Sequence, residues 1–172
     1  AIARNTGLHC RVLGPAELEK RKMNALLAVG RGSAASPRLI VLEHKPKGRA
    51  ARGGAGPLCI VGKGVTFDSG GLSLKTAVGM MEMKHDMSGA ATVVGLMQAI
   101  ARLSLPVHVV GVIGAAENMP SGTASRPGDV VRAMSGKTIE ILNTDAEGRV
   151  VLADALHFAN VEYHPSAMID VA

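Results

Sequence analysis

Short apolar runs alternate along this chain with segments of helical periodicity, and that alternation restricts the fold more than any other feature of the sequence. Runs typical of strands occupy residues 39–42, 58–61, 107–113, 137–142 and 166–171. Segments with the apolar periodicity of helices occupy residues 14–27, 86–103 and 143–158. Residues 45–57 are expected to form an exposed connection, and the glycine-containing residues 62–85 a long loop. Strands that alternate with amphipathic helices are typical of layered α/β folds. We therefore predict an α/β fold in which a mixed, largely parallel sheet is flanked by helices as three layers, α/β/α.

The length of 172 residues is that of one domain with a single core. Hydrophobic residues make up 47% of the chain and aromatic residues only 2%, so aliphatic side chains must fill that core. The scarcity of aromatic side chains disfavours proteins that bind nucleic acids by stacking bases. The net charge of +5 is concentrated in residues 4–22 and 45–52. We interpret these stretches as solvated basic faces, with nucleic-acid binding as the alternative.

Several features of the sequence indicate a cytoplasmic protein. No apolar run reaches the roughly 18 residues that span a bilayer, and residues 1–11 lack the apolar centre of a signal peptide. Cys10 and Cys59 have neither a metal-ligand spacing nor a disulfide framework, which favours free thiols in a reducing cytosol.

The chain begins without Met and ends within a predicted strand, so we expect it to be part of a longer protein.

Acidic residues gather where predicted strands end. Lys63 and Asp68 follow the apolar run 58–61, Asp145 and Glu147 follow the run 137–142, and Asp86 begins a predicted helix between them. Ligands bind beyond the carboxyl ends of strands in such folds, so these side chains are expected to converge. Buried carboxylates without partners are costly, and oxygen ligands suit divalent cations. Two such ions would offset four carboxylates, which predicts a two-metal hydrolytic centre.

Each of these residues also has a simpler interpretation when taken alone. Asp86 and Asp145 could cap helices, Glu147 could be an exposed first-turn acid, and Lys63 could lie in a surface turn. Their expected proximity favours the metal centre over four unrelated roles. A lysine ligates a metal only when it is deprotonated, and burial next to a cation would lower the pKa of Lys63 in that direction. The sequence has no Walker A loop, no His-Glu-x-x-His motif and no Gly-x-Ser-x-Gly elbow around Ser69.

Four ordered motifs resemble those of the leucine aminopeptidase (cytosol aminopeptidase) family of dizinc peptidases. They are VGKG with DSGG in residues 61–71, MKHDMSGAA in residues 83–91, ENMPSG in residues 117–122 and NTDAEGR in residues 143–149. Any one of these motifs alone would be weak evidence for the resemblance, whereas four in the same order at matching separations are specific to the family. The resemblance covers nearly the whole chain and is strongest after residue 57.

The resemblance implies two metal sites that share ligands. Lys63, Asp68, Asp86 and Glu147 would hold the tighter ion, and Asp68, Asp145 and Glu147 would hold the more exchangeable one. Asp68 and Glu147 would therefore bridge two Zn²⁺ or Mn²⁺ ions. Both ions would polarise the scissile carbonyl and lower the pKa of a bridging water molecule.

The resemblance also implies catalytic and substrate-binding residues outside the metal ligands. Lys75 would stabilise the gem-diolate that forms at the scissile carbonyl. Arg149 would hold a bicarbonate ion that acts as general base. Met83, Asp86 and Asn143 would contact the substrate, with Met83 lining the pocket for its first side chain.

The function implied is a dimetal aminopeptidase that hydrolyses the N-terminal peptide bond of peptides, with a preference for Leu or other bulky apolar first residues. Residues 1–172 would be part of the catalytic domain of a homohexamer, without the family's N-terminal domain and without the rest of the catalytic domain. Two alternatives stay open. One is a DNA-binding architectural or regulatory role, which some bacterial relatives of the family have. The other is a two-metal centre that acts on phosphoesters.

Overall fold

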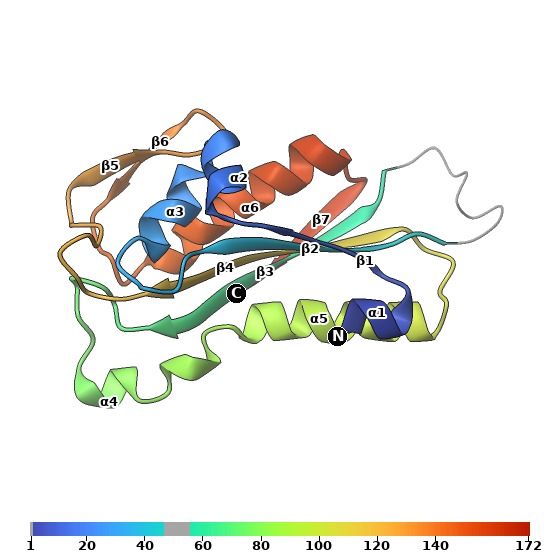
Figure 1. The fold of residues 1–172 in the computed structure, drawn as a ribbon, viewed down its shortest axis with the longest axis horizontal. Helices are drawn as coiled ribbons and strands as arrows, with labels where there is room; N and C mark the ends of the chain where they lie inside the picture. The colour runs from blue at the N-terminus through green and yellow to red at the C-terminus, as the bar shows by residue number, and fades with distance from the viewer. Residues whose placement is uncertain (1, 47–55) are drawn as a thin grey trace.

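The computed structural model describes residues 2–46 and 56–172, and its centre is a five-stranded sheet in the order β1-β2-β4-β3-β7 (Figure 1). The strands are β1 (His9–Leu13), β2 (Arg38–His44), β3 (Leu58–Asp68), β4 (Val109–Asn118) and β7 (Ala167–Val171). Strand β2 is antiparallel to both β1 and β4, whereas β3 is parallel to both β4 and β7. The sheet is therefore mixed, and the predicted α/β class is confirmed.

Helices cover both faces of this sheet, as predicted (Figure 1). One face carries α1 (Ile2–Thr6) and α5 (Ser88–Arg102). The other face carries α2 (Pro15–Lys20), α3 (Asn24–Gly30) and α6 (Glu147–Tyr163). No helix in the described part of the chain is long and apolar enough to cross a membrane.

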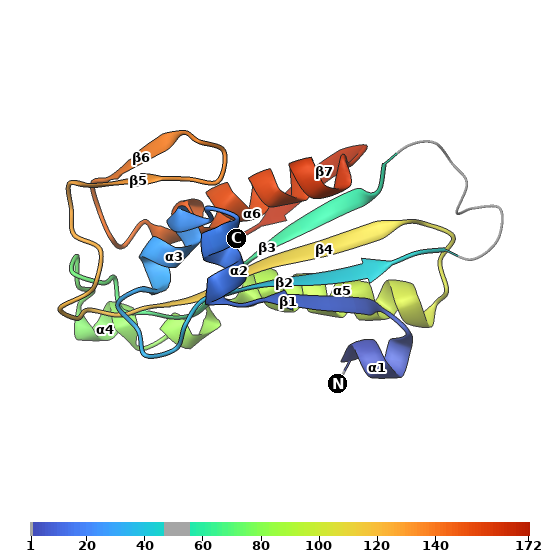
Figure 2. The same ribbon diagram turned by 45° about the horizontal axis from the view of Figure 1, so that its top comes forward.

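Two smaller elements lie beside the three layers. A hairpin of β5 (Asp129–Arg132) and β6 (Thr138–Ile141) forms a separate two-stranded sheet on the side of α3 and α6 (Figure 2). The connection from β3 to α5 contains α4 (Ala77–Met80) and the short 3₁₀-helix η2 (Met83–His85). Both smaller elements extend from the end of the sheet where β3 and β4 finish (Figures 1 and 2).

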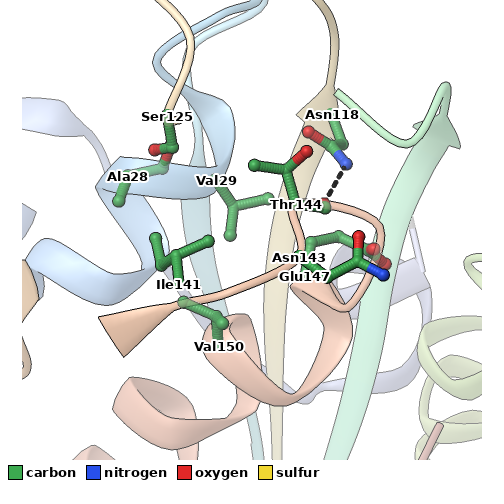
Figure 3. Close-up of a pocket in the computed structure, with 9 residues that line it drawn as sticks. All are labelled: Ala28, Val29, Asn118, Ser125, Ile141, Asn143, Thr144, Glu147 and Val150. Carbon is green, nitrogen blue, oxygen red and sulfur yellow. Dashed lines mark hydrogen bonds between the residues drawn. The ribbon is translucent and has the colours of Figure 1, made fainter. Parts of the chain in front are cut away.

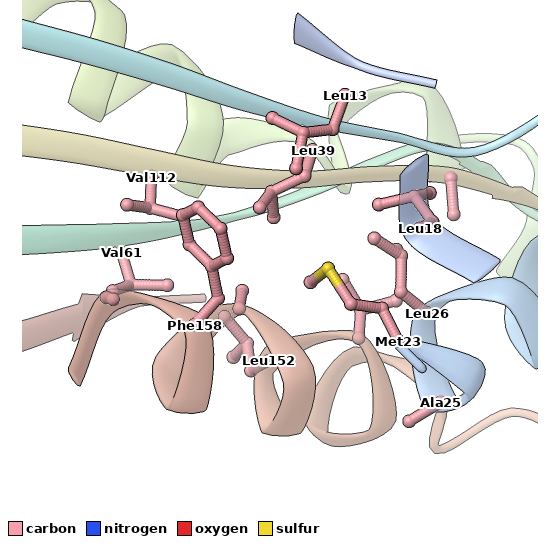
Figure 4. Packing of buried hydrophobic residues seen from close by; sticks show 14 of the residues in the cluster. Leu13, Leu18, Met23, Ala25, Leu26, Leu39, Val61, Val112, Leu152 and Phe158 are labelled. Carbon is pink, nitrogen blue, oxygen red and sulfur yellow. The ribbon is translucent and has the colours of Figure 1, made fainter. Parts of the chain in front are cut away.

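Aliphatic side chains fill the core on both faces of the sheet. Figure 4 shows the Phe158 ring reaching from α6 toward Val112 and Leu39 on the sheet, and all three belong to one buried cluster. On the opposite face, Val93 and Met97 of α5 are fully buried in a second cluster. This packing fixes α5 and α6 against β3 and β4, so the residues at the starts of both helices have defined positions relative to those strands.

The structure corrects the predicted helix over residues 14–27. The segment forms two helices, α2 and α3, because the chain turns at Lys22, whose φ of 58° lies in the left-handed region. The side chains of Leu18, Met23 and Leu26 nevertheless are fully buried in one cluster, as their spacing indicated.

Strand β3 is longer than the predicted run 58–61 and continues to Asp68, through residues expected to form a loop. Residues 58–65 pair with β4, so Gly62 and Gly64 lie in a paired strand and do not interrupt it. The pairing register shifts between Val65 and Asp68. Strands β1 and β5 were not predicted. Most of the predicted exposed connection over residues 45–57 lies outside the described residues.

Candidate metal centre

Three separate parts of the fold bring carboxylates to one place. Asp68 ends β3, Asp86 directly follows η2, and Glu147 begins α6. One oxygen from each of these three side chains lies within 4.8 Å of the others, a grouping that could hold a metal ion. The predicted convergence of these residues is confirmed. It arises because β3 carries Asp68 to the edge at which α5 and α6 begin.

Lys63 lies between two of these carboxylates. Its Nζ is 2.6 Å from Asp86 Oδ1 and 2.9 Å from Glu147 Oε1. Gly148 makes room for the lysine, because a Cβ at that position would lie 2.8 Å from Lys63 Cε. Burial alone would lower the pKa of Lys63, but the bonds to Asp86 and Glu147 outweigh it and raise the pKa above its ordinary value. In this arrangement Lys63 is an ammonium ion, and it would have to lose a proton to ligate a metal.

A second lysine pairs with the remaining acids. Lys75 Nζ lies 2.6 Å from Asp145 Oδ1 and 3.0 Å from Asp68 Oδ2. Burial would lower the pKa of Lys75, but its bonds to Asp145 and Asp68 raise it well above the ordinary value. Lys75 therefore carries a fixed positive charge beside the acidic cluster at neutral pH.

Two of the four acids are deeply buried. Glu147 is 4% exposed and Asp68 is 2% exposed. Burial raises the pKa of Glu147 to about 6, although its bond to Lys63 acts in the opposite direction. Asp68 Oδ1 accepts hydrogen bonds from Gly70 N and from Asn118 Nδ2, both at 2.8 Å, so this oxygen is already fully engaged.

The charge and the hydrogen bonding of the cluster fit divalent cations. Among the described residues, these four carboxylates form ion pairs with two ammonium groups, which leaves an excess of negative charge in a partly buried site. Asp86 Oδ2 is buried and has no hydrogen-bond partner among the described residues. Buried charge of this kind is costly unless cations accompany it, and carboxylate oxygens are ligands that Mg²⁺, Mn²⁺ and Zn²⁺ accept.

The simpler interpretations of the individual residues are wrong. Neither α5 nor α6 has a side-chain hydrogen bond at its N-cap, so Asp86 and Asp145 do not cap them. Glu147 lies in the first turn of α6 but is buried there instead of exposed. Lys63 lies in strand β3 and not in a surface turn.

The other predicted residues lie around this cluster. Arg149 lines an open cavity of about 320 Å³ together with Lys63, Asp145 and Glu147. Asn143 is exposed, and its Oδ1 accepts a hydrogen bond from the Asp145 amide at 2.8 Å. Met83 is half-buried on η2, three residues before Asp86.

Two buried polar residues were not singled out from the sequence. The Asn118 side-chain amide donates to Asp68 Oδ1 at 2.8 Å and to the Thr144 carbonyl at 2.9 Å (Figure 3). Asn118 and Thr144 are each 5% exposed. Both belong to the recognised motifs, and a polar residue at the end of an apolar strand was the available signal for Asn118.

The chain is similar to known proteins over its whole length. The model of the cytosol aminopeptidase family, catalytic domain, matches residues 1–172. A probable cytosol aminopeptidase of Chlorobium limicola is 54% identical over 166 residues, which cover 96% of this chain and 32% of the relative. A probable cytosol aminopeptidase of Dechloromonas aromatica is 55% identical over 172 residues, which cover 100% of this chain and 34% of the relative. The chain thus spans about a third of the length of the curated relatives that it matches.

A solved structure supports the same likeness in three dimensions. The bottromycin maturation enzyme BotP in complex with Mn is similar to this chain with a TM-score of 0.88 and 47% sequence identity. The superposition covers 99% of this chain and 36% of the BotP chain.

Proposed function

Because this chain belongs to the cytosol aminopeptidase family, we propose that it carries the metal centre of a metallo-aminopeptidase, which hydrolyses the N-terminal peptide bond of peptides. The observation that supports this proposal best is the grouping of Asp68, Asp86 and Glu147 within 4.8 Å, with Lys63 between two of them. Families with the same fold can differ in chemistry, so the proposal rests on this site and not on the fold.

We propose that five residues hold two Zn²⁺ or Mn²⁺ ions. Lys63, Asp68, Asp86 and Glu147 would hold the tighter ion, and Asp68, Asp145 and Glu147 the more exchangeable one. The BotP structure, which is similar over almost the whole chain, is a complex with Mn. Bound ions would polarise the scissile carbonyl and lower the pKa of a water molecule between them.

Lys75 is suited to stabilise negative charge on the substrate. Its ammonium group is held by Asp68 and Asp145, and these bonds raise the pKa of Lys75, so the charge persists at neutral pH. A fixed positive charge beside the carbonyl would stabilise the oxyanion as it develops. We therefore propose Lys75 as a catalytic residue.

Arg149 is suited to bind a small anion. It lines the open cavity beside Lys63, Asp145 and Glu147, and it is exposed on the first turn of α6. A guanidinium group can hold a planar carboxylate-like anion through two parallel hydrogen bonds. We propose that Arg149 holds bicarbonate and that the bound anion acts as general base.

The substrate would be oriented by its free amino group. An acidic cluster with excess negative charge attracts an ammonium or amine group, which favours cleavage next to the N-terminus. Met83, Asp86 and Asn143 are proposed to contact the first residue of the peptide, and a preference for Leu or other bulky apolar residues follows from the resemblance.

The homohexamer and the cytoplasmic location are proposed on the same basis. The DNA-binding alternative rests on residues 45–52, of which residues 47–52 lie outside the described part of the chain.

The test compares three substrates on the intact, Mn²⁺-loaded protein: Leu-amide, N-acetyl-Leu-amide and a phosphate monoester. The proposal expects turnover of Leu-amide alone, because acetylation removes the free amine and the monoester lacks the amide bond. Hydrolysis of the acetylated amide at a similar rate would contradict the role of the amine. Hydrolysis of the monoester alone would replace the proposal with phosphoester chemistry.

A further inference from the structure

Three hydrogen bonds join the loop after β3 to the loop before α6, and Thr144 takes part in all of them. The Thr144 hydroxyl donates to the Gly70 carbonyl at 2.6 Å and accepts from the Ser73 amide at 2.8 Å. The Thr144 amide donates to Ser73 Oγ at 3.1 Å. Thr144 is only 5% exposed, so water competes weakly for these groups. We refer to these three bonds as the Thr144 clasp.

The two loops approach closely because glycines form the turn opposite Thr144. Gly70 and Gly71 have φ angles of 86° and 65°, which other residues rarely adopt. A Cβ on Gly71 would lie 3.1 Å from Thr144 Oγ1, and a Cβ on Gly70 would lie 2.9 Å from Asp145 Oδ1. Side chains at these positions would therefore push the two loops apart.

Apolar packing does little to hold the loop that the clasp joins. Its two large apolar side chains, Leu72 and Leu74, are 45% and 60% exposed. Within the loop, the Lys75 amide donates to the Ser69 carbonyl at 2.9 Å. The position of the loop relative to α6 therefore depends mainly on hydrogen bonds, and the clasp provides three of them.

The clasp lies next to the ion pair between the two loops. Ser73 is two residues before Lys75, and Thr144 directly precedes Asp145. Lys75 Nζ and Asp145 Oδ1 are 2.6 Å apart. No regular secondary structure separates the clasp from Lys75 or from Asp145. Any movement of one loop relative to the other would therefore change the distance between Lys75 Nζ and Asp145 Oδ1.

We propose that Thr144 and Ser73 are positioning residues, whose reciprocal hydrogen bonds hold the Lys75 ammonium group in place beside the acidic cluster. Neither residue is assigned to bind the ions or the substrate. The effect on catalysis rests on the proposed function, whereas the effect on the loop does not. A displacement of about 1 Å in a catalytic group can reduce a rate roughly 100-fold.

The test uses Thr144→Val, which keeps the shape of the side chain but removes the hydroxyl, and Thr144→Ser, which restores it. Thr92→Val is the matched control, since it removes an exposed hydroxyl that bonds only within α5. Hydrogen exchange at the Ser73 amide is measured on the intact protein, and kcat, KM and bound Mn²⁺ are measured at saturating Mn²⁺. Ser73→Ala provides a second, milder variant that removes one bond of the clasp.

Thr144→Val is expected to speed exchange at the Ser73 amide at least tenfold. Its kcat for Leu-amide is expected to fall roughly 10- to 100-fold with KM and bound Mn²⁺ unchanged. Thr144→Ser is expected to return the exchange rate and kcat to within about threefold of the parent. Ser73→Ala is expected to give values between those of the parent and those of Thr144→Val. A purely structural role would instead reduce bound metal along with kcat. Unchanged exchange at the Ser73 amide in Thr144→Val overturns the positioning role. A loss of kcat in Thr144→Ser as large as that in Thr144→Val overturns it as well.

The two proposals fail in different ways. If the parent protein does not cleave Leu-amide, the proposed function is lost, and exchange at the Ser73 amide still decides whether the clasp holds the loop. If the parent cleaves Leu-amide and Thr144→Val cleaves it equally fast, the positioning role of Thr144 is overturned and the proposed function stands.

Discussion

Removal of the Lys75 side chain should lower the rate of catalysis without loss of bound metal. Lys75 contacts Asp68 and Asp145 but is not proposed as a metal ligand, so Lys75→Ala should retain both ions. Loss of one group that stabilises an oxyanion typically lowers kcat by about 10²–10³. The variant is compared by Leu-amide turnover and elemental analysis with Lys137→Ala, which changes an exposed lysine on the hairpin. Unchanged turnover in Lys75→Ala would remove this residue from the mechanism.

Asp68 tests the metal site itself. It is 2% exposed, its Oδ2 contacts Lys75 Nζ, and its Oδ1 accepts hydrogen bonds from Asn118 and Gly70. Asp68→Ala should therefore deplete bound metal, which elemental analysis of the purified protein measures. Asp129→Ala, which removes ion pairs with Arg31 and Arg126 at the start of β5, should leave the metal content unchanged. Full retention of two ions in Asp68→Ala contradicts the proposed bridging role.

The two cysteines should differ sharply in reactivity. Cys10 is exposed on β1, whereas Cys59 is fully buried in β3, and burial raises the pKa of its thiol to about 11. The thiolate is the reactive form, so Cys59 stays unreactive as the pH rises to 8. A thiol reagent should modify one cysteine in the native protein at pH 8 and two in denaturant. Rapid modification of both in the native state would show that Cys59 is accessible.

At the scale of elements, Asp154 ties α6 to two neighbours. It is fully buried, its Oδ2 accepts from the Leu26 amide of α3 at 3.0 Å, and its Oδ1 accepts from the Met134 amide after β5 at 2.8 Å. In Asp154→Asn one of these amides would face an NH₂ group and lose its acceptor. We expect a loss of about 1–3 kcal/mol in the free energy of unfolding.

Chemical denaturation of the metal-saturated protein measures this change. Asp170→Asn, an exposed position on β7, is the matched control and should be close to neutral. Equal stability of the two variants would mean that the Asp154 carboxylate is not needed to join α6 to α3 and the hairpin.

The elements also show what sequence periodicity can and cannot predict. Strands β2 and β7 and helices α5 and α6 were expected within a few residues, because apolar spacing reflects which side chains are buried. Gly62 and Gly64 indicated a loop, yet pairing with β4 keeps them in a strand. Pairing between distant segments is a tertiary effect that overrides local preference.

The same limit applies to the candidate site. Lys63, Asp68, Asp86 and Glu147 were expected to converge because buried charge at strand ends needs partners, and they do. The role of Thr144 could not be inferred, since its partners lie 71 and 74 residues away and its hydrogen bonds follow no sequence period. Metal occupancy and the catalytic roles stay predictions.

For the molecule as a whole, the cluster joins parts of the fold that are distant in sequence. Its members come from β3, from the residues just before α5 and from the start of α6, and these two helices cover opposite faces of the sheet. Ions held by all three parts bind the folded state and not the unfolded chain, so they should stabilise the tertiary fold. At a metal concentration 100 times the dissociation constant, one ion contributes about 2.7 kcal/mol.

For a chain of this length, 1 kcal/mol corresponds to roughly 2–4 °C in Tm. Removing the metal from the intact protein with a chelator should therefore lower Tm by at least roughly 5 °C, and added Mn²⁺ should restore it. Asp68→Ala should melt at the same temperature with and without chelator, because it lacks the shared ligand. The comparison separates metal binding from other effects of the chelator. Loss of a bound ion lowers the Tm of the parent protein alone, whereas any other effect of the chelator would lower the Tm of both proteins. Equal melting of the parent protein in both conditions would show that the acidic cluster does not bind divalent ions in the folded state.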